Sequence, residues 1–175
     1  MPPGEQAALT GFEIDITTEV NGEAVKRRVK ARQHLADFVR DELGLTGTHL
    51  GCEHGICGSC SIMLDGEVVR GCLTLAVQAH GRRVQTIEGL SESGALRPLQ
   101  KAFAARNAAQ CGFCSSGMLL TAYQLLGAKR PATREAVREY LSGNLCRCTG
   151  YQAIVDAVTD VLRERTVAGK AARDE

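Results

Sequence analysis

The sequence GCEHGICGSC occupies residues 51–60 and decides the fold, because it places three cysteines, at positions 52, 57 and 60, within one short loop. A fourth cysteine, Cys72, follows after eleven residues, which include the hairpin dipeptide Asp65-Gly66. Three thiolates can therefore meet in the loop while a fourth arrives from a neighbouring strand. Glycines alternate with these cysteines, and a residue without a Cβ can turn backbone N–H groups toward an anion.

The spacing of these cysteines indicates the kind of centre they hold. The pattern C-x4-C-x2-C with a distant fourth cysteine is the plant-type [2Fe–2S] pattern, whereas structural zinc sites favour paired C-x2–4-C knuckles. We therefore predict a [2Fe–2S] cluster here, with a zinc loop as the alternative. His54 is expected to be an exposed or hydrogen-bonding loop residue, because Rieske-type histidine ligands come in pairs. The predicted ligands are Cys52, Cys57, Cys60 and Cys72.

Strand-like sequence lies on both sides of this loop. Apolar and polar residues alternate through Phe12, Ile14 and Ile16, and the hairpin signal Asn21-Gly22 follows. An amphipathic stretch that ends at Gly44 predicts a helix before the loop. The elements expected in this half are a strand through 12–16, a returning strand at 24–29, a helix at 34–43, strands at 61–64 and 68–72, and a last strand at 84–87.

The second half is predicted to be helical. Helices are expected at 98–107, 116–126, 133–141 and 151–165, which suits a four-helix bundle. The fold class is therefore α+β, with a strand-rich domain followed by a helical one. The expected domains are 10–88 and 89–166, joined by linker-like sequence near 88–96, with solvated flexible tails at 1–9 and 167–175.

The helical half carries a second set of four cysteines. Cys111-x2-Cys114 is separated by 31 residues from Cys146-x-Cys148. Ser115 and Ser116 are placed to cap one helix, and Thr149-x-x-Gln152 has the pattern of a capping box for another. Helix N-termini favour thiolates and anions. The local chemistry fits an iron–sulfur cluster and also leaves zinc open.

Composition limits the other possibilities. The chain has 175 residues and a formal net charge of +1, which argues against nucleic-acid binding. Its eight cysteines make up about 5% of the 175 residues, below the ~8–10% expected of a disulfide scaffold. The sequence shows no secretory signal, and its longest largely apolar stretch, 117–127, is short of the ~20 residues that a membrane span needs. A cytoplasmic protein with reduced thiols is expected.

Three stretches together resemble the xanthine oxidase family of molybdenum hydroxylases. They are GCEHGICGSC at 51–60, QCGFC at 110–114 and GNLCRCTGY at 143–151. The chain resembles the separate small iron–sulfur subunit of bacterial members, of the carbon monoxide dehydrogenase, isoquinoline oxidoreductase and aldehyde oxidoreductase types, over about residues 10–165. One departure is Ser115-Ser116, where the family commonly has Thr-Pro.

The resemblance implies a fold, a role and partners. It implies a β-grasp ferredoxin domain and a four-helix domain, each with one [2Fe–2S] cluster. The chain would pass electrons from molybdopterin, often the cytosine dinucleotide, on a large subunit to FAD on a medium subunit, within a dimer of heterotrimers. The substrate chemistry would then belong to the large subunit, and Gln110 and Cys148 would lie beside the pterin. The ligands implied for the second cluster are Cys111, Cys114, Cys146 and Cys148.

Two other functions fit the residues less well. One is a zinc-stabilised interaction module, and the other is a free-standing diffusible ferredoxin. Neither nucleotide-binding G-x-G-x-x-G nor a P-loop occurs in the chain, and no serine-hydrolase or zincin motif occurs either. We therefore expect an electron carrier that performs no substrate chemistry by itself.

Overall fold

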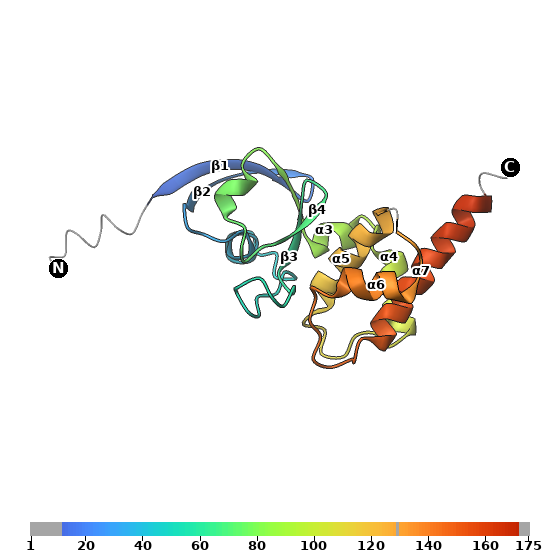
Figure 1. Ribbon diagram of the computed structural model, residues 1–175. Coiled ribbons are helices and arrows are strands. Elements are labelled where there is room, and N and C mark those ends of the chain that lie inside the picture. Colours follow the sequence, from blue (N-terminus) through green and yellow to red (C-terminus); the bar gives the residue numbers. More distant parts are fainter. Residues whose placement is uncertain (1–11, 129, 172–175) are drawn as a thin grey trace.

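A strand-rich part and a helical part lie side by side (Figure 1). This computed structural model describes residues 12–128 and 130–171, so the tail predicted at 1–9 lies outside the described residues. The strand-rich part holds the amino-terminal half of the chain, and the helical part holds the carboxyl-terminal half. This order confirms the predicted α+β class.

The first part is a mixed five-stranded sheet in the order β2-β1-β5-β3-β4. Its two hairpins close at Asn21-Gly22 and Asp65-Gly66, and all four residues have positive φ, as such tight turns require. Strands β1 and β5 run parallel, and the other neighbours are antiparallel. The strands are β1 (Glu13–Val20), β2 (Glu23–Lys30), β3 (Ser61–Leu64), β4 (Glu67–Arg70) and β5 (Arg83–Gln85).

A helical segment packs against this sheet and leads to the cysteine loop. It begins as α2 (Leu35–Asp37) and continues as a π-helical turn, η1 (Phe38–Glu42), where regular helix was predicted. Phe38 is fully buried with Ile62 in the core of the sheet domain, so the segment is held by its apolar face. A short 3₁₀ turn, η2 (Ala76–Ala79), covers the same core.

Five helices form the second part, one more than predicted. The additional helix is α3, in the segment expected to be a linker. That expectation is wrong for residues 88–92, because Leu90 packs into the helical core and makes the segment part of the fold. The helices are α3 (Ile87–Glu92), α4 (Arg97–Ala105), α5 (Ser115–Gly127), α6 (Arg134–Leu141) and α7 (Gln152–Ala171).

The last helix extends beyond its predicted end. Ile154 and Val158 of α7 are buried in the helical core, in agreement with the apolar stripe of the sequence. The helix then continues to Ala171, into the stretch predicted to be a tail. No helix in the described ranges is long and apolar enough to cross a bilayer.

Candidate metal centres

The first set of cysteines lies in the loop that joins the η1 segment to β3. Cys60 and Cys72 are buried, and Cys52 and Cys57 are partly exposed. Gly55 and Gly58 have φ of +84° and +75°, and Glu53 takes the same left-handed region at +54°. These conformations wind the loop around its own sulfurs, so that the Cys57 N–H donates to Cys52 Sγ at 3.3 Å.

The thiols of this loop differ in how readily they ionise. Backbone N–H groups of Cys57 and His54 donate to Cys52 and lower its pKa to about 6. Burial, together with the hydrogen bond to Cys60, raises the pKa of Cys72 to about 11. A buried thiolate at Cys72 therefore needs a neighbouring positive charge, which a metal ligated by these sulfurs provides.

The second set of cysteines is assembled from two distant stretches of chain. Cys114 lies at the N-cap of α5, and Cys111 precedes it in the same loop. The loop between α6 and α7 brings the other two cysteines back to them. Cys148 Sγ lies 3.5 Å from Cys111 Sγ, and Cys146 shares a hydrogen bond with Cys114.

Burial and hydrogen bonding also divide these four thiols. Burial, together with the hydrogen bond to Cys146, raises the pKa of Cys114 to about 12. Burial acts in the same direction on Cys146, but the Thr149 hydroxyl and nearby amides outweigh it, and its pKa is lowered. The Phe113 N–H lowers the pKa of Cys111. The site thus supplies donors to sulfur while partly excluding water.

In both sites the sulfurs meet in pairs. Hydrogen bonds join Cys52 to Cys57, Cys60 to Cys72 and Cys114 to Cys146, and Cys111 and Cys148 touch. In residues 12–128 and 130–171, no three Cys, His, Asp or Glu side chains converge as ligands of a single ion. A [2Fe–2S] cluster binds two ligands on each iron. Two pairs of sulfurs in each site therefore fit this group.

Two predictions about helix capping are wrong. Ser115 begins α5 as its first residue, and the N-cap is Cys114, with no side-chain cap. Gln152 is the first residue of α7 and accepts from Arg134 Nη2 at 2.7 Å, so it closes no capping box. Thr149 instead donates to Cys146 Sγ at 3.1 Å and accepts from the Tyr151 N–H at 3.2 Å.

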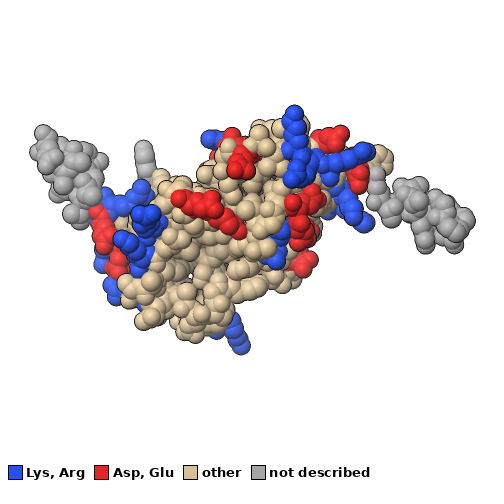
Figure 2. Space-filling view, turned by 180° about the vertical axis from the view of Figure 1, so that it is seen from behind, with Lys and Arg blue, Asp and Glu red and all other residues tan. Residues whose placement is uncertain are grey.

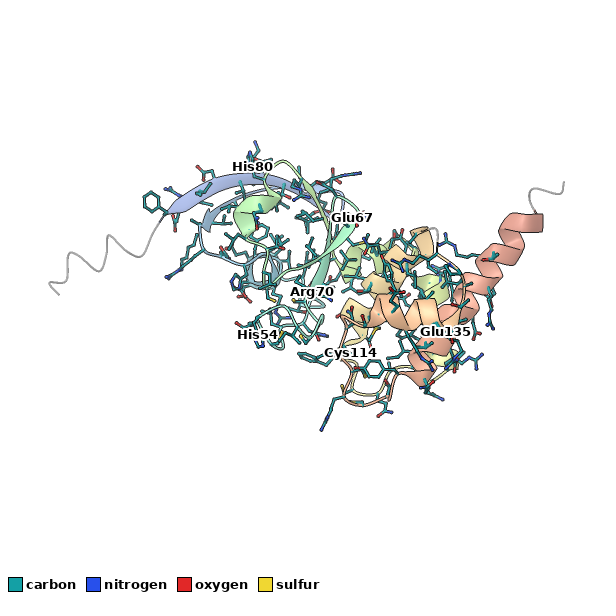
Figure 3. The ribbon with its side chains drawn as sticks, in the orientation of Figure 1. His54, Glu67, Arg70, His80, Cys114 and Glu135 are labelled. Atoms are coloured by element: carbon teal, nitrogen blue, oxygen red, sulfur yellow. The ribbon has the colours of Figure 1, made fainter. Side chains whose placement is uncertain are left out.

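The other residues singled out from the sequence lie at the surface. Gln110 is exposed directly before Cys111, and Cys148 is exposed beside it. His54 is exposed at the first loop (Figure 3), as expected. The contact of Gln110 and Cys148 with a pterin stays a prediction.

The two cysteine sites are joined by a short interface. The Leu145 N–H donates to the Cys57 carbonyl at 2.8 Å, which links a residue next to Cys146 with a cysteine of the first loop. Asn144 is buried and donates from Nδ2 to the Gly58 carbonyl at 3.2 Å. Arg70, which lies between the two parts in Figure 3, donates to the Gly143 carbonyl at 2.6 Å.

Glycine makes this close approach possible. A Cβ on Gly58 would lie 2.6 Å from the Gly143 carbonyl oxygen and 2.8 Å from Asn144 Nδ2. A Cβ on Gly117, at the start of α5, would overlap the Gly58 carbonyl. Backbone therefore packs directly on backbone between the two sites. Sequence reasoning missed this interface, because nothing local to Asn144 shows that its partner is Gly58.

A second contact joins the loops near the protein surface. The ring of His49 stacks on Phe113, with ring centroids 4.9 Å apart. His49 Nδ1 also lies 2.8 Å from the Phe113 carbonyl oxygen. Phe113 stands between Cys111 and Cys114, so this stack fixes the second ligand loop against the first domain.

Comparison with known proteins identifies the family. The model of the 2Fe-2S iron-sulfur cluster binding domain matches residues 18–87, and that of the [2Fe-2S] binding domain matches residues 86–159. The small subunit of nicotine 6-hydroxylase from Paenarthrobacter nicotinovorans is 56% identical over 147 residues, which cover 84% of this chain and 88% of that protein. The chain belongs to the iron–sulfur subunits of the xanthine oxidase family of molybdenum hydroxylases.

Other members of the family agree in sequence and fold. The gamma subunit of caffeine dehydrogenase from Pseudomonas sp. (strain CBB1) is 52% identical over 149 residues, covering 83% of this chain and 89% of that one. A chain of quinoline 2-oxidoreductase from Pseudomonas putida 86 superposes with a TM-score of 0.83 at 49% identity, covering 91% of this iron–sulfur subunit and 99% of that chain. The chain is therefore the electron-transfer subunit of an oxidoreductase complex, and it carries [2Fe–2S] clusters.

Proposed function

We propose that this iron–sulfur subunit carries single electrons from molybdopterin on a large subunit to FAD on a medium subunit. The observation that carries the proposal is the pair of four-cysteine sites joined through the Leu145–Cys57 hydrogen bond. The route enters at the helical site and leaves at the loop of the first domain. The proposed ligands of the first cluster are Cys52, Cys57, Cys60 and Cys72, and those of the second are Cys111, Cys114, Cys146 and Cys148.

The paired sulfurs suggest how each set divides between two irons. We assign Cys52 and Cys57 to one iron of the first cluster, and Cys60 and Cys72 to the other, because these are the thiols that contact each other. In the second site the pairs are Cys111 with Cys148 and Cys114 with Cys146. Each bound cluster stores one electron, which suits a chain that separates a two-electron oxidation into single steps.

The chain's own atoms provide the connection between the sites. The path runs from Cys146 through its peptide bond to Leu145, across the N–H to the Cys57 carbonyl at 2.8 Å, and on to the Cys57 side chain. Asn144 holds this contact by bonding to Gly58, the next residue in the first loop. Beside this path, the backbone of Gly58 packs closely on Gly143 and Asn144.

Gln110 and Cys148 are proposed to face the pterin. Gln110 has an amide that both donates and accepts, and its position is fixed by Cys111 next to it. Cys148 is exposed, so its sulfur can accept a hydrogen bond from a partner while it ligates iron. We expect Gln110→Ala to leave both cluster spectra unchanged and to slow substrate-driven reduction or lower molybdenum occupancy. Unchanged kinetics with full occupancy would overturn this assignment.

Apolar side chains near the sites support assembly with partner subunits. Ile56 and Leu73 beside the first site are 59% and 62% exposed, and Phe113 and Leu145 beside the second are each 46% exposed. On the face drawn in Figure 2, charged side chains gather above and at the sides, and the lower part carries few. The cysteine loops lie on this lower side in Figure 1. Uncharged surface with exposed apolar groups is typical of a buried interface.

The rest of the proposal concerns organisation. We propose a ferredoxin-like domain and a helical cluster domain, each enclosing one cysteine set, with the boundary predicted at 88/89 moved to the start of α3 at Ile87, because α3 packs in the helical core. We also propose that the subunit assembles into a dimer of heterotrimers. A cytoplasmic location is proposed because the eight cysteines are free of disulfides, which suits a reducing compartment.

Metal analysis of the purified complex tests the proposed ligand sets. A chain with two [2Fe–2S] clusters holds about four irons and four acid-labile sulfides. One or two zinc ions per chain, without sulfide, would contradict the assignment and favour a zinc-stabilised module.

A further inference from the structure

Three hydrogen bonds form a closed ring around Cys146. The Cys146 N–H donates to the Tyr151 hydroxyl at 2.9 Å. The Tyr151 N–H donates to Thr149 Oγ1 at 3.2 Å. The Thr149 hydroxyl donates to Cys146 Sγ at 3.1 Å and closes the ring.

The ring fixes the direction of the bond to sulfur. A backbone N–H can only donate, so the bond from Tyr151 makes the Thr149 oxygen an acceptor there. The hydroxyl proton is then directed to Cys146 Sγ. The N–H of Cys146 donates to the phenol oxygen, and the sulfur receives the Thr149 hydroxyl as its side-chain donor, beside the backbone N–H groups of Cys148 and Thr149. In residues 12–128 and 130–171, no other hydroxyl donates to a cysteine sulfur.

The backbone is bent to make this ring. Gly150 has φ of +65°, and Tyr151, which carries a bulky side chain, has φ of +68°. A residue such as tyrosine adopts this region only where its surroundings require it. The bend turns the Tyr151 N–H back to Thr149 and places its hydroxyl at Cys146. Gln152, which follows, is held by Arg134 and Arg138 of α6, so the bend is anchored on its far side.

We infer that Thr149 is a positioning residue that raises the reduction potential of the second centre through its hydrogen bond to Cys146. This rests on the proposed function, in which Cys146 is a cluster ligand. A reduced cluster is more negative than an oxidised one, so a donor to its sulfur stabilises the reduced form more. The hydroxyl makes the helical site a better electron acceptor without altering its ligands.

Three variants of the purified complex test this inference. Thr149→Val removes the hydroxyl at almost constant volume, and Thr149→Ser restores it. Tyr151→Phe is the matched control, because it removes the other hydroxyl of the ring and leaves the donor to sulfur in place. The measurement is a redox titration of both centres followed by EPR, with pulsed EPR in D₂O to detect an exchangeable deuteron near the second centre.

The expected result is a lower midpoint potential for the second centre in Thr149→Val, with the first centre unchanged. The exchangeable deuteron coupling should be lost in that variant, and both properties should return in Thr149→Ser. Tyr151→Phe should keep the native potential. If Thr149→Val loses the centre, Thr149→Ala replaces it with the same expectation.

Two results would overturn the inference about Thr149 and leave the proposed function standing. One is an unchanged potential in Thr149→Val, and the other is an equal shift in Thr149→Val and Tyr151→Phe, which would assign the effect to the bend. Failure of the proposed function is distinguishable, because the native complex would then lack a [2Fe–2S] signal that disappears in Cys146→Ser. That result would overturn both.

Discussion

Each of the two cysteine sites holds four thiols, but the two sites position them in different ways. The first site is a single glycine-rich loop closed by Cys72, and its sulfurs receive backbone N–H groups. The second is built from two loops that meet only because the helices pack, and its Cys146 receives a side-chain hydroxyl. Local sequence therefore determines the geometry of the first site, whereas tertiary packing determines that of the second.

Replacement of Gly58 should produce the largest effect, because this residue serves both sites. In Gly58→Ala the new Cβ meets the Gly143 carbonyl and the strained φ of +75° remains. We expect the free energy of unfolding to fall by about 2 kcal/mol or more, because backbone strain and overpacking act together. Thermal unfolding and EPR should show a less stable protein with a disturbed first centre.

Gly112 provides the matched control in the second site. Its φ is +82°, but a Cβ there would meet nothing within 4 Å. Gly112→Ala should therefore lower the free energy of unfolding only by the strain of alanine at positive φ, about 1–2 kcal/mol. Equal losses in both variants would show that the close approach of Gly58 to the helical part does not matter.

Asn144 should show the next largest effect, because it is buried between the two sites. Asn144→Leu leaves the Gly58 carbonyl and the Thr121 hydroxyl without this partner. The expected cost is about 1–3 kcal/mol. Denaturant unfolding measures this change in the free energy of unfolding. Thr121→Val removes only one of the hydrogen-bond partners of Asn144 and should lower the free energy of unfolding by less. A neutral Asn144→Leu would mean that the interface does not depend on this side chain.

The cysteines of the two sites should differ in thiol reactivity once the chain has been freed of metal by chelation. The pKa of Cys52 is lowered to about 6, and that of Cys114 is raised to about 12. A lowered pKa keeps the thiolate populated down to about pH 6, whereas Cys114 stays a thiol through neutral pH. Mass spectrometry after brief alkylation at about pH 7.5 should find Cys52 modified well before Cys114. The reverse order would contradict the described loop geometry.

Turn chemistry made much of the first domain predictable. Asn21-Gly22 and Asp65-Gly66 close hairpins where the sequence indicated them, because both dipeptides accept the positive φ of tight turns. The π-helical turn at Phe38–Glu42 was not distinguished from regular helix, since both bury a similar apolar face. Helix α3 was missed because Gly89 and Ser91 resemble linker sequence, although Leu90 is buried.

The sequence indicated the cysteine sets but not what surrounds them. Thr149 matched a helix-capping pattern, and the pattern contains no information about the sulfur of Cys146 that it contacts. Asn144 and Gly58 are far apart in the chain, so their contact depends on how the two domains pack. In each case the partner is chosen by tertiary structure.

The central claim is that the chain holds two separate [2Fe–2S] centres, one on each set of cysteines. EPR of the reduced complex tests it most directly when native protein is compared with Cys57→Ser and Cys114→Ser. Two overlapping signals are expected in the native protein, and each variant should lose a different one and keep the other. A single native signal of one spin per chain, or loss of both signals in either variant, would contradict the account.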